Sequence, residues 1–580
     1  MGLVPTRSLA SPAERIAVLV HEGFDLFYAE FMRLTRQSRR LFDACEWIGL
    51  HEESHRRIDL YVEHVGRTLG TLSPITSTYP QDLGLWTAAH THYDRMVAHR
   101  PDVEVARTFF NAITRKIFRT VGVKPQIEFL ENDYAEQTPP RPGLYRRIAL
   151  GDDLLASFTE ILRHPRPELS WTDITGDAAY LVERFLEAHP NPRFDSVDVL
   201  DTLFFRVREG YVVGRLVRGE TTFPLIIPVQ SVPGGAVVDG AIFTVEEAQE
   251  VFSSTRAYMF VDLERPSDMV RFLGTMMPEL SVSERYISIA HHRHGKTLIY
   301  RELVEHLESS SDRFVVAPGI RGLVMTVFTM PSYRNVFKII RDRFEKPGAT
   351  RDGIMRSYRD VFRGRRVGRL ADTQEFEHLA FDRKRFTDEC LRELLDKASD
   401  TVRVVGDKVV VSHLYIEEKM MPLNIYMAQA PIEDAQRAIV DYGQAIKELA
   451  ANDIFAGDLL WKNFGVTRFG QLVLYDYDEI CPLTACRFRA IPRARSFEDE
   501  MSAQPWYPVD DADVFPEEWE PFIVPHRSRR LRDAFMSAHA DLFTPHFWLR
   551  KQADVRAGEL HIGLPYVPRN PELQRARIRV

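Results

Sequence analysis

The first third of the chain has the hydrophobic spacing of amphipathic helices. Apolar residues recur at intervals of three and four over residues 16–31, and the same spacing returns over residues 47–65 and 105–121. The preceding sequence Ser11-Pro12-Ala13-Glu14 is a capping box with proline at the first helical position. We therefore predict a helix that begins at Pro12 and a mainly helical chain up to about Ala188.

The hydrophobic period then changes to two. Strand-like segments separated by short polar turns predict a small β-meander over residues 203–229. A helical stretch expected over residues 282–307 leads to the polar segment 309–312, which is the best candidate for a domain boundary. Beyond it, short strands, an amphipathic helix over residues 432–451 and glycine-containing turns alternate.

Composition narrows the class of protein. A chain of 580 residues exceeds what one hydrophobic core supports, so at least two domains are expected. The net charge of -8 provides no basic field for nucleic acid or an anionic membrane, which favours a protein or small-molecule partner. The four cysteines are scattered, and no signal peptide or membrane span is apparent, so we predict a cytoplasmic protein.

A glycine-containing loop lies between two strand-like segments just after the predicted boundary. Glycine lets backbone N–H groups approach phosphates closely, so the loop is a candidate ATP-binding segment. Its residues are Ala317, Pro318, Gly319, Ile320, Arg321, Gly322 and Leu323. One strand later, Lys338 lies inside an apolar run, where a kinase lysine contacts the α- and β-phosphates. Taken alone, the loop could be an ordinary hairpin and Lys338 an ordinary surface residue. The occurrence of the lysine one strand after the glycine-containing loop favours a kinase-like nucleotide site.

The next predicted strand, over residues 409–417, leads into a segment that resembles a kinase hinge. Backbone groups of residues 417–422 could form hydrogen bonds with adenine. Glu417 and Met420 are therefore candidate nucleotide contacts.

The spacing of the next polar residues is that of kinase catalytic machinery. Asp458 and Asn463 have the D-x-x-x-x-N spacing, in which the aspartate accepts the substrate hydroxyl proton and the asparagine binds metal. A predicted hairpin over residues 464–475 returns the chain to Asp476-Tyr477-Asp478, beside Asn463. We predict Asp458 as the catalytic base and Asn463, Asp476 and Asp478 as ligands of Mg²⁺ or Mn²⁺.

Other features depart from the ordinary kinase pattern. The sequence contains no G-x-G-x-x-G, H-R-D or A-P-E motif, and Asp-Tyr-Asp replaces D-F-G. No glutamate in residues 351–366 stands out as the helical partner of Lys338, although Glu375 and Glu377 are available.

Several segments resemble the isocitrate dehydrogenase kinase/phosphatase family, the bacterial regulator of the glyoxylate bypass. In the second half they are APGIRGLVMTVF, VFKIIRDRF, VGRLADTQEFE, LYIEEKMMPLNIY and IFAGDLLWKNFGVTRFGQLVLYDYDEIC. In the first half they are GFDLFYAEF, VARTFFNAITRKIF and LIIPVQ, and near the end DVFPEE and HADLF. The resemblance spans nearly the whole chain.

Together with the hydrophobic pattern, the resemblance implies an α+β fold in two parts. Residues 1–312 would form a mainly helical regulatory domain with a small β-meander. Residues 313–580 would form a bilobal protein-kinase-like domain, with an N-lobe over about 313–421 and a C-lobe over about 422–580 that includes a helical C-terminal extension.

The resemblance also implies a bifunctional serine kinase/phosphatase that modifies isocitrate dehydrogenase at one ATP site, controlling flux between the tricarboxylic acid cycle and the glyoxylate bypass. ATP or ADP would support the phosphatase direction, and AMP would shift the balance between activities. The family pattern assigns Asp372 to the phosphatase direction. The residues themselves leave Asp372, Asp476 and Asp478 open as the group that activates water. The oligomeric state also stays open, a homodimer included.

Alternative functions rest on single features. A pseudokinase would bind nucleotide and isocitrate dehydrogenase without transferring phosphate, and an aspartyl-phosphate phosphatase would use Asp476 as its nucleophile. His51-Glu52-Glu53-Ser54-His55 matches a zinc-protease motif without an evident third ligand. Cys481 and Arg487 match the C-x₅-R spacing of cysteine phosphatases, but the segment lacks loop glycines, so we expect a structural or inert thiol there.

Overall fold

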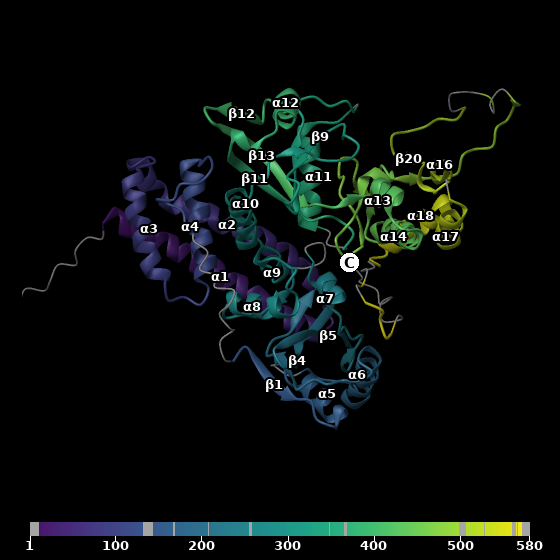
Figure 1. Ribbon diagram of the computed structural model, residues 1–580, viewed down its shortest axis with the longest axis horizontal. Coiled ribbons are helices and arrows are strands. Elements are labelled where there is room, and N and C mark those ends of the chain that lie inside the picture. Colours follow the sequence, from purple (N-terminus) through teal and green to yellow (C-terminus); the bar gives the residue numbers. More distant parts are fainter. Residues whose placement is uncertain are drawn as a thin grey trace, which may run out of the picture. The chain divides into compact units, whose positions relative to one another are not determined.

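The computed structural model describes most of the chain, which divides into two compact units (Figure 1). One is built mainly from residues before Asp312, and the other mainly from residues after it. The described residues are 11–130, 143–165, 169–206, 208–253, 258–346, 348–364, 368–497, 501, 506–526, 528–559, 564 and 566–570. Within these ranges, no helix combines the length and the apolar composition needed to cross a membrane.

The N-terminal unit begins with long helices packed around α1. α1 starts at Pro12, as predicted, because Ser11 Oγ accepts the N–H of Glu14 at 3.2 Å and Glu14 Oε2 accepts the N–H of Ser11 at 2.8 Å. Aromatic rings fill the space between the helices, with Phe24 and Phe27 of α1 against Phe109 of α4. The helices are α1 (Pro12–Asp43), α2 (Trp47–Thr78), α3 (Leu83–Val97) and α4 (Val103–Phe118).

A seven-stranded sheet follows, with the order β1-β2-β4-β3-β7 and with β5 pairing with both β4 and β6. Its strands are β1 (Tyr145–Ala149), β2 (Ser196–Leu200), β3 (Phe204–Arg206), β4 (Glu209–Arg218), β5 (Thr221–Val232), β6 (Gly235–Val238) and β7 (Phe260–Val261). The helices α5 (Leu154–Arg163) and α6 (Ile174–Ala188) share its apolar core. The predicted meander corresponds to β3, β4 and β5. β6 extends this meander by one more strand, whereas β1, β2 and β7 pair with strands that are more distant in the sequence.

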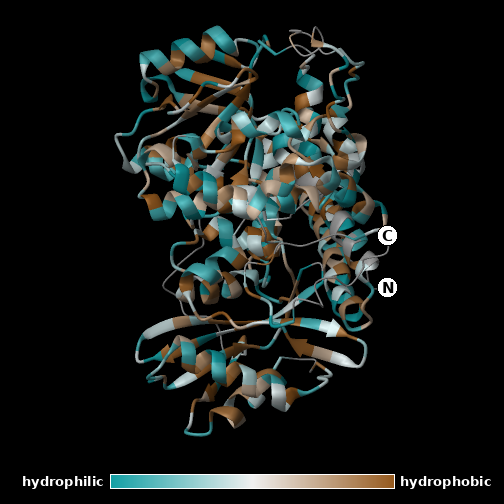
Figure 2. Cartoon of the chain, turned by 90° about the vertical axis from the view of Figure 1, so that its right-hand side faces the viewer, coloured by the Kyte–Doolittle hydropathy of each residue, from teal (hydrophilic) through white to brown (hydrophobic). Residues whose placement is uncertain are grey.

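Shorter helices complete this unit: α7 (Val245–Phe252), α8 (Pro266–Met276), α9 (Val282–Ser288) and α10 (His292–Ser309). The helical stretch expected over residues 282–307 is present as two helices, α9 and α10. Ala290 has a φ of 60°, a left-handed conformation that an α-helix cannot continue through, so the chain forms α9 and α10 instead. In Figure 2 the helices alternate between teal and brown residues, as amphipathic helices do.

The C-terminal unit opens with a six-stranded sheet in the order β11-β13-β10-β9-β8, with β12 beside β13. The pairs β8–β9, β9–β10, β10–β13 and β12–β13 are antiparallel. The elements of this lobe are β8 (Val315–Val316), β9 (Met325–Thr329), β10 (Asn335–Ile340), α11 (Arg351–Gly364), β11 (Thr373–Asp382), α12 (Asp388–Lys397), β12 (Val402–Val405) and β13 (Lys408–Glu418).

The rest of this unit is mainly helical and surrounds small β-ladders. The core joins α14 to the C-terminal helices through buried residues such as Tyr442, Phe535 and Trp548. The elements are β14 (Met421–Pro422), α13 (Leu423–Gln429), α14 (Ile432–Ala450), β15 (Ile454–Phe455), β16 (Phe464–Val466), β17 (Leu472–Leu474), β18 (Cys481–Pro482), β19 (Arg487–Phe488), β20 (Asp513–Val514), α16 (Glu520–Ile523), α17 (Arg529–His539) and α18 (Pro545–Arg556). The predicted α+β class is confirmed.

Candidate active site

The glycine-containing loop of residues 317–323 joins β8 to β9 at one edge of the six-stranded sheet. Gly319 has a φ of 125°, a backbone conformation that residues with a Cβ rarely adopt. The guanidinium of Arg321 forms an ion pair with Glu393 and lies 3.6 Å from Glu389, both on α12. The loop conformation therefore requires glycine, and one side chain anchors the loop within its own lobe.

Lys338 extends from the middle of β10 into the interior. Its Nζ lies 2.6 Å from Glu417 Oε2 and donates a hydrogen bond to the carbonyl of Tyr475 at 2.8 Å. The side chains of Lys338 and Glu417 are only 7% and 1% exposed. Because Val336 faces Glu417 across the β10–β13 ladder and side chains two apart share a face, Lys338 and Glu417 are diagonal neighbours.

The partner of Lys338 is thus Glu417, a residue that the sequence suggested only as a hinge contact. Glu375, one of the two glutamates considered, instead contacts His413 at 2.8 Å. Burial raises the pKa of Glu417 above its ordinary value, while Lys338 and a 2.7 Å hydrogen bond from the Thr373 hydroxyl act in the opposite direction. Antiparallel pairing of the two predicted strands was the signal that could have identified this partner.

The segment after β13 connects the six-stranded sheet to a three-stranded one. Met421 of β14 pairs with Val466 of β16. A Cβ added to Gly465 would lie 2.8 Å from the Cβ of Met420, so the backbone approaches this side chain closely. Met420 therefore lies where the strand that carries Glu417 meets the hairpin that leads to Asp476.

Asp458 and Asn463 form one compact loop after β15. Asp458 Oδ1 accepts the N–H of Leu460 at 2.9 Å, and Asn463 Nδ2 donates to the carbonyl of Asp458 at 3.2 Å. Lys462 Nζ lies 3.8 Å from Asp458 Oδ2 and balances its charge. The backbone contacts hold the carboxylate at a fixed place while 30% of its side chain stays exposed to a reactant.

The hairpin of β16 and β17 carries the next acids back beside this loop. Phe464 pairs with Leu474, and the N–H of Tyr475 donates to the carbonyl of Asn463 at 3.1 Å. Asp476 therefore follows directly after a residue bonded to Asn463. The predicted convergence of Asn463 and Asp476 corresponds to this backbone contact.

The two carboxylates of the Asp-Tyr-Asp segment interact. The N–H of Asp478 donates to Asp476 Oδ1 at 3.3 Å. Burial, together with the charge of Asp476, raises the pKa of Asp478 to about 7. Asp478 Oδ1 is buried, and none of the residues that the structure describes forms a hydrogen bond with it. Two half-buried carboxylates, on a segment whose backbone is bonded to that of Asn463, offer the oxygen ligands preferred by Mg²⁺ or Mn²⁺.

Asp372 lies at the same end of β17 as Asp476. The N–H of Ala371 donates to the carbonyl of Leu474 at 2.9 Å, and the hydroxyl of Tyr477 donates to the carbonyl of Ala371 at 2.6 Å. Gln374 Nε2 donates to Asp372 Oδ2 at 2.8 Å, which orients the carboxylate. The chain thus brings the residue assigned to the phosphatase direction next to the Asp-Tyr-Asp segment.

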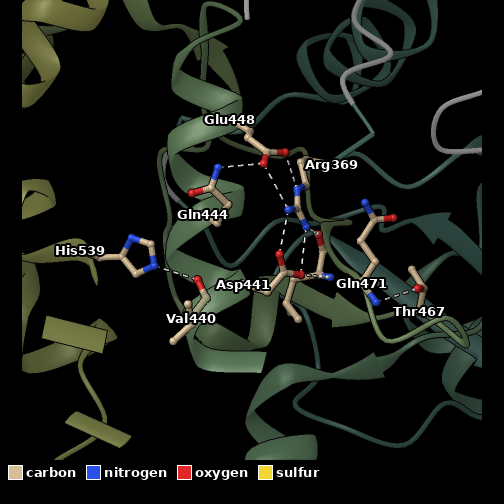
Figure 3. A network of polar contacts seen from close by, with 9 residues as sticks. Arg369, Val440, Asp441, Gln444, Glu448, Thr467, Gln471 and His539 are labelled. Atoms are coloured by element: carbon tan, nitrogen blue, oxygen red, sulfur yellow. Dashed lines mark hydrogen bonds and ion pairs between the residues drawn. The ribbon is translucent and has the colours of Figure 1, made fainter. Parts of the chain in front are cut away.

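A buried arginine fixes this arrangement (Figure 3). The guanidinium of Arg369 lies 2.7 Å from both Asp441 and Glu448 of α14, and Asp441 also accepts the N–H of Leu472 at 2.8 Å. The charges of these carboxylates raise the pKa of Arg369, against the effect of its burial. Arg369 thereby connects the helix, β17 and the segment that leads to Asp372.

The zinc-protease motif lies on α2, but the side chains of His51 and His55 are outside the described residues. The arginine of the C-x₅-R match, Arg487, forms ion pairs with Asp510 and Asp513. These contacts give it a structural role beside β20.

A glycine loop and an ion-paired lysine on an antiparallel sheet, followed by a D-x-x-x-x-N loop and a hairpin aspartate, define a protein-kinase-like phosphotransferase. The chain belongs to the isocitrate dehydrogenase kinase/phosphatase family. The model of the family's kinase domain, "Isocitrate dehydrogenase kinase/phosphatase (AceK) kinase domain", matches residues 312–568, and the model of its regulatory domain matches residues 17–311.

Curated relatives carry the same family name. The chain is 39% identical over 558 residues to the isocitrate dehydrogenase kinase/phosphatase of Anaeromyxobacter sp. (strain Fw109-5), covering 95% of this chain and 96% of the relative. It is 40% identical over 573 residues to that of Anaeromyxobacter dehalogenans (strain 2CP-C), with 96% and 97% covered. It is 38% identical over 567 residues to the isocitrate dehydrogenase kinase/phosphatase of Paraburkholderia phytofirmans, and the alignment covers 95% of this chain and 92% of the relative. The predicted family and its bifunctional kinase/phosphatase class are confirmed, and neither the pseudokinase nor the aspartyl-phosphate phosphatase is supported.

Proposed function

We propose that this chain transfers the γ-phosphoryl group of ATP to a serine of isocitrate dehydrogenase and removes that phosphate at the same site. The observation that carries the proposal is the convergence of Lys338, Glu417, Asp458, Asn463 and Asp476 within one compact unit. By this reaction the protein would control flux between the tricarboxylic acid cycle and the glyoxylate bypass.

In the kinase direction, residues 317–323 would cover the triphosphate and Lys338 would contact its α- and β-phosphates. Glu417 keeps the ammonium in place without the solvent reorganisation that a free lysine would need. Met420 and the backbone from Glu417 onward would contact adenine. Asp458 would accept the proton of the serine hydroxyl. The ammonium of Lys462 would balance the negative charge of the Asp458 carboxylate.

Asn463, Asp476 and Asp478 would hold Mg²⁺ or Mn²⁺. When bound, the cation neutralises charge on the transferring phosphoryl group. The buried carboxylate of Asp478 supports this assignment, since a buried charge normally has a partner.

In the phosphatase direction, a water must attack the phosphoserine. We assign its activation to Asp372, whose carboxylate is oriented by Gln374 at the edge of the Asp-Tyr-Asp segment. ADP or ATP would occupy the nucleotide site during this reaction.

Regulation and location complete the proposal. Residues 1–312 would regulate the catalytic residues 313–580, and AMP would shift the balance between the two activities. The protein would work in the cytoplasm with isocitrate dehydrogenase as its partner.

The decisive experiment incubates the chain with γ-labelled ATP and isocitrate dehydrogenase, then replaces ATP with ADP. We expect label on a serine of the substrate and later release as inorganic phosphate. Asp458→Asn should lower the transfer by about 10²–10⁴-fold while nucleotide still binds. The control is Asp434→Asn, which removes a carboxylate paired with Arg437 on α14. Absence of transfer by the parent chain under every nucleotide condition would contradict the proposal.

A further inference from the structure

Two cysteines lie in contact in the C-terminal unit. Cys481 Sγ and Cys486 Sγ are 3.6 Å apart, and both residues are partly exposed. A disulfide needs the sulfurs at about 2.05 Å, so a movement of about 1.5 Å separates this thiol pair from a bond. Neither sulfur has a role in the proposed phosphoryl transfer.

The short segment between the cysteines is held on both sides. The carbonyls of Leu483 and Cys486 each accept a hydrogen bond from Gln552 Nε2 at 2.7 Å. On the other side, Asp453 accepts the N–H of Leu483 at 3.1 Å and that of Thr484 at 2.8 Å. These contacts keep the two thiols facing each other, so their proximity is a property of the folded segment.

The pair is also joined to both acidic loops of the candidate active site. Cys481 pairs with Phe455 in the β15–β18 ladder, and β15 leads directly to Gly457 and Asp458. In the other direction, Cys481 follows Asp478 by three residues. A Cβ placed on Gly457 would lie 2.5 Å from the Cβ of Glu479, so the two loops already touch. A displacement of Cys481 would therefore reach both loops.

We propose that Cys481 and Cys486 form a reversible disulfide that lowers phosphoryl transfer by displacing the loops of Asp458 and Asp478. The oxidant would be a low-molecular-weight disulfide such as glutathione disulfide. The thiolate of Cys481 attacks one of its sulfurs, forming a mixed disulfide and releasing one glutathione thiolate. Cys486 then attacks the Cys481 sulfur and releases the second glutathione. The two protein thiols lose two electrons and two protons, and the oxidant gains them.

The order of attack follows from the contact between the thiols. The hydrogen bond to Cys481, with partial burial, raises the pKa of Cys486 above its ordinary value. Cys486 therefore stays protonated to a higher pH than an ordinary thiol does. Disulfide formation should accordingly become faster as the pH rises, because the second attack requires the Cys486 thiolate.

The first test detects the bond. The full-length chain is equilibrated in glutathione buffers of increasing disulfide fraction, quenched with acid, alkylated and digested with trypsin. Both cysteines fall in one tryptic peptide, residues 469–487. We expect this peptide to become two hydrogen atoms lighter and resistant to alkylation, and dithiothreitol to reverse the change. A mixed glutathione adduct alone, or no change at any ratio, overturns the proposal.

The second test measures the consequence, and this part rests on the proposed function. Oxidation should lower label transfer to isocitrate dehydrogenase by about tenfold or more, since small misplacements of catalytic groups are costly. Cys486→Ser and Cys481→Ala should keep full activity in the same buffers, while Cys45→Ser, in the other compact unit, should stay sensitive to oxidation. A disulfide without loss of activity overturns the switch. Inactive reduced protein would contradict the proposed function instead, and the peptide result would stand.

Discussion

The ammonium of Lys338 and the carboxylate of Glu417 lie 2.6 Å apart on two hydrogen-bonded strands of the same sheet. In ordinary protein kinases the glutamate partner of this lysine is on a mobile helix, whose position controls activity. Here the backbone ladder of β10 and β13 holds both residues. The position of the lysine is therefore fixed by the sheet and does not depend on the placement of a helix.

The first prediction concerns this pair. Glu417→Gln preserves shape but leaves the buried ammonium of Lys338 without its counter-charge. Removing one partner of a buried ion pair typically costs about 3–5 kcal/mol. We expect a marked loss of thermal stability and weaker ATP binding, measured by calorimetry. Glu375→Gln is the matched control, because its contact with His413 is at a more exposed position, and it should change either quantity little.

The second prediction separates the two activities. Asp372→Asn should lower phosphate release from phosphorylated isocitrate dehydrogenase by about 10²–10⁴-fold, because the amide cannot accept a proton from water. Transfer from ATP should fall far less, since Asp458 serves that direction. Both rates are measured on the same preparation. An equal loss in both directions would assign Asp372 to a shared step, such as positioning the Asp-Tyr-Asp segment.

The third prediction tests the close approach of the catalytic loop to the Asp-Tyr-Asp segment. Gly457 has a φ of 73°, and a Cβ there would lie 2.7 Å from the carbonyl oxygen of Glu479. Gly457→Ala should therefore displace Asp458 and reduce transfer in both directions, in addition to about 1–3 kcal/mol of backbone strain.

The control for backbone strain is Gly470→Ala, in the turn of the β16–β17 hairpin. Its φ of 79° is equally unfavourable for alanine, but nothing lies within 4 Å of the added Cβ. Gly470→Ala should lower the free energy of unfolding but leave the rates of phosphoryl transfer unchanged. Equal rates in the two variants would show that the contact with Glu479 is unimportant.

The fourth prediction is a pH dependence in the N-terminal unit. Burial raises the pKa of Glu104 on α4 from 4.5 to about 7. The native state then holds a proton that the unfolded state has lost between these values, so stability falls as the pH rises from about 4.5 to 7. Glu104→Gln should remove this component and be relatively more stable at pH 8 than at pH 5, by up to about 3 kcal/mol.

The measurement is the melting temperature of full-length variants at both pH values. The control is Glu63→Gln on α2, whose carboxylate is 56% exposed and contacts Arg67 at 3.5 Å. The difference in melting temperature between Glu63→Gln and the parent chain should be the same at both pH values. If the effect of Glu104→Gln on the melting temperature were also the same at both pH values, the pKa of Glu104 would not be raised in the folded protein.

Local features of this chain can be predicted from the sequence because they depend on residues that are neighbours along the chain. The helix start at Pro12 needs only the capping box, and the loop of Asp458 and Asn463 needs only its own spacing and the hairpin that follows. The strand position of Lys338 follows from the alternation around it. These elements, with the order of the motifs, were enough to predict a kinase-like site, whereas the family was predicted from the resemblance of longer segments.

Contacts between distant segments were decided by the tertiary structure. Glu417 becomes the partner of Lys338 only through the register of β10 and β13, and Arg369 meets Asp441 and Glu448 only when α14 packs against β17. Cys481 and Cys486 are close in sequence, yet their contact depends on Gln552 of α18. Periodicity shows which face of an element is buried, whereas strand register and helix packing determine what that face meets.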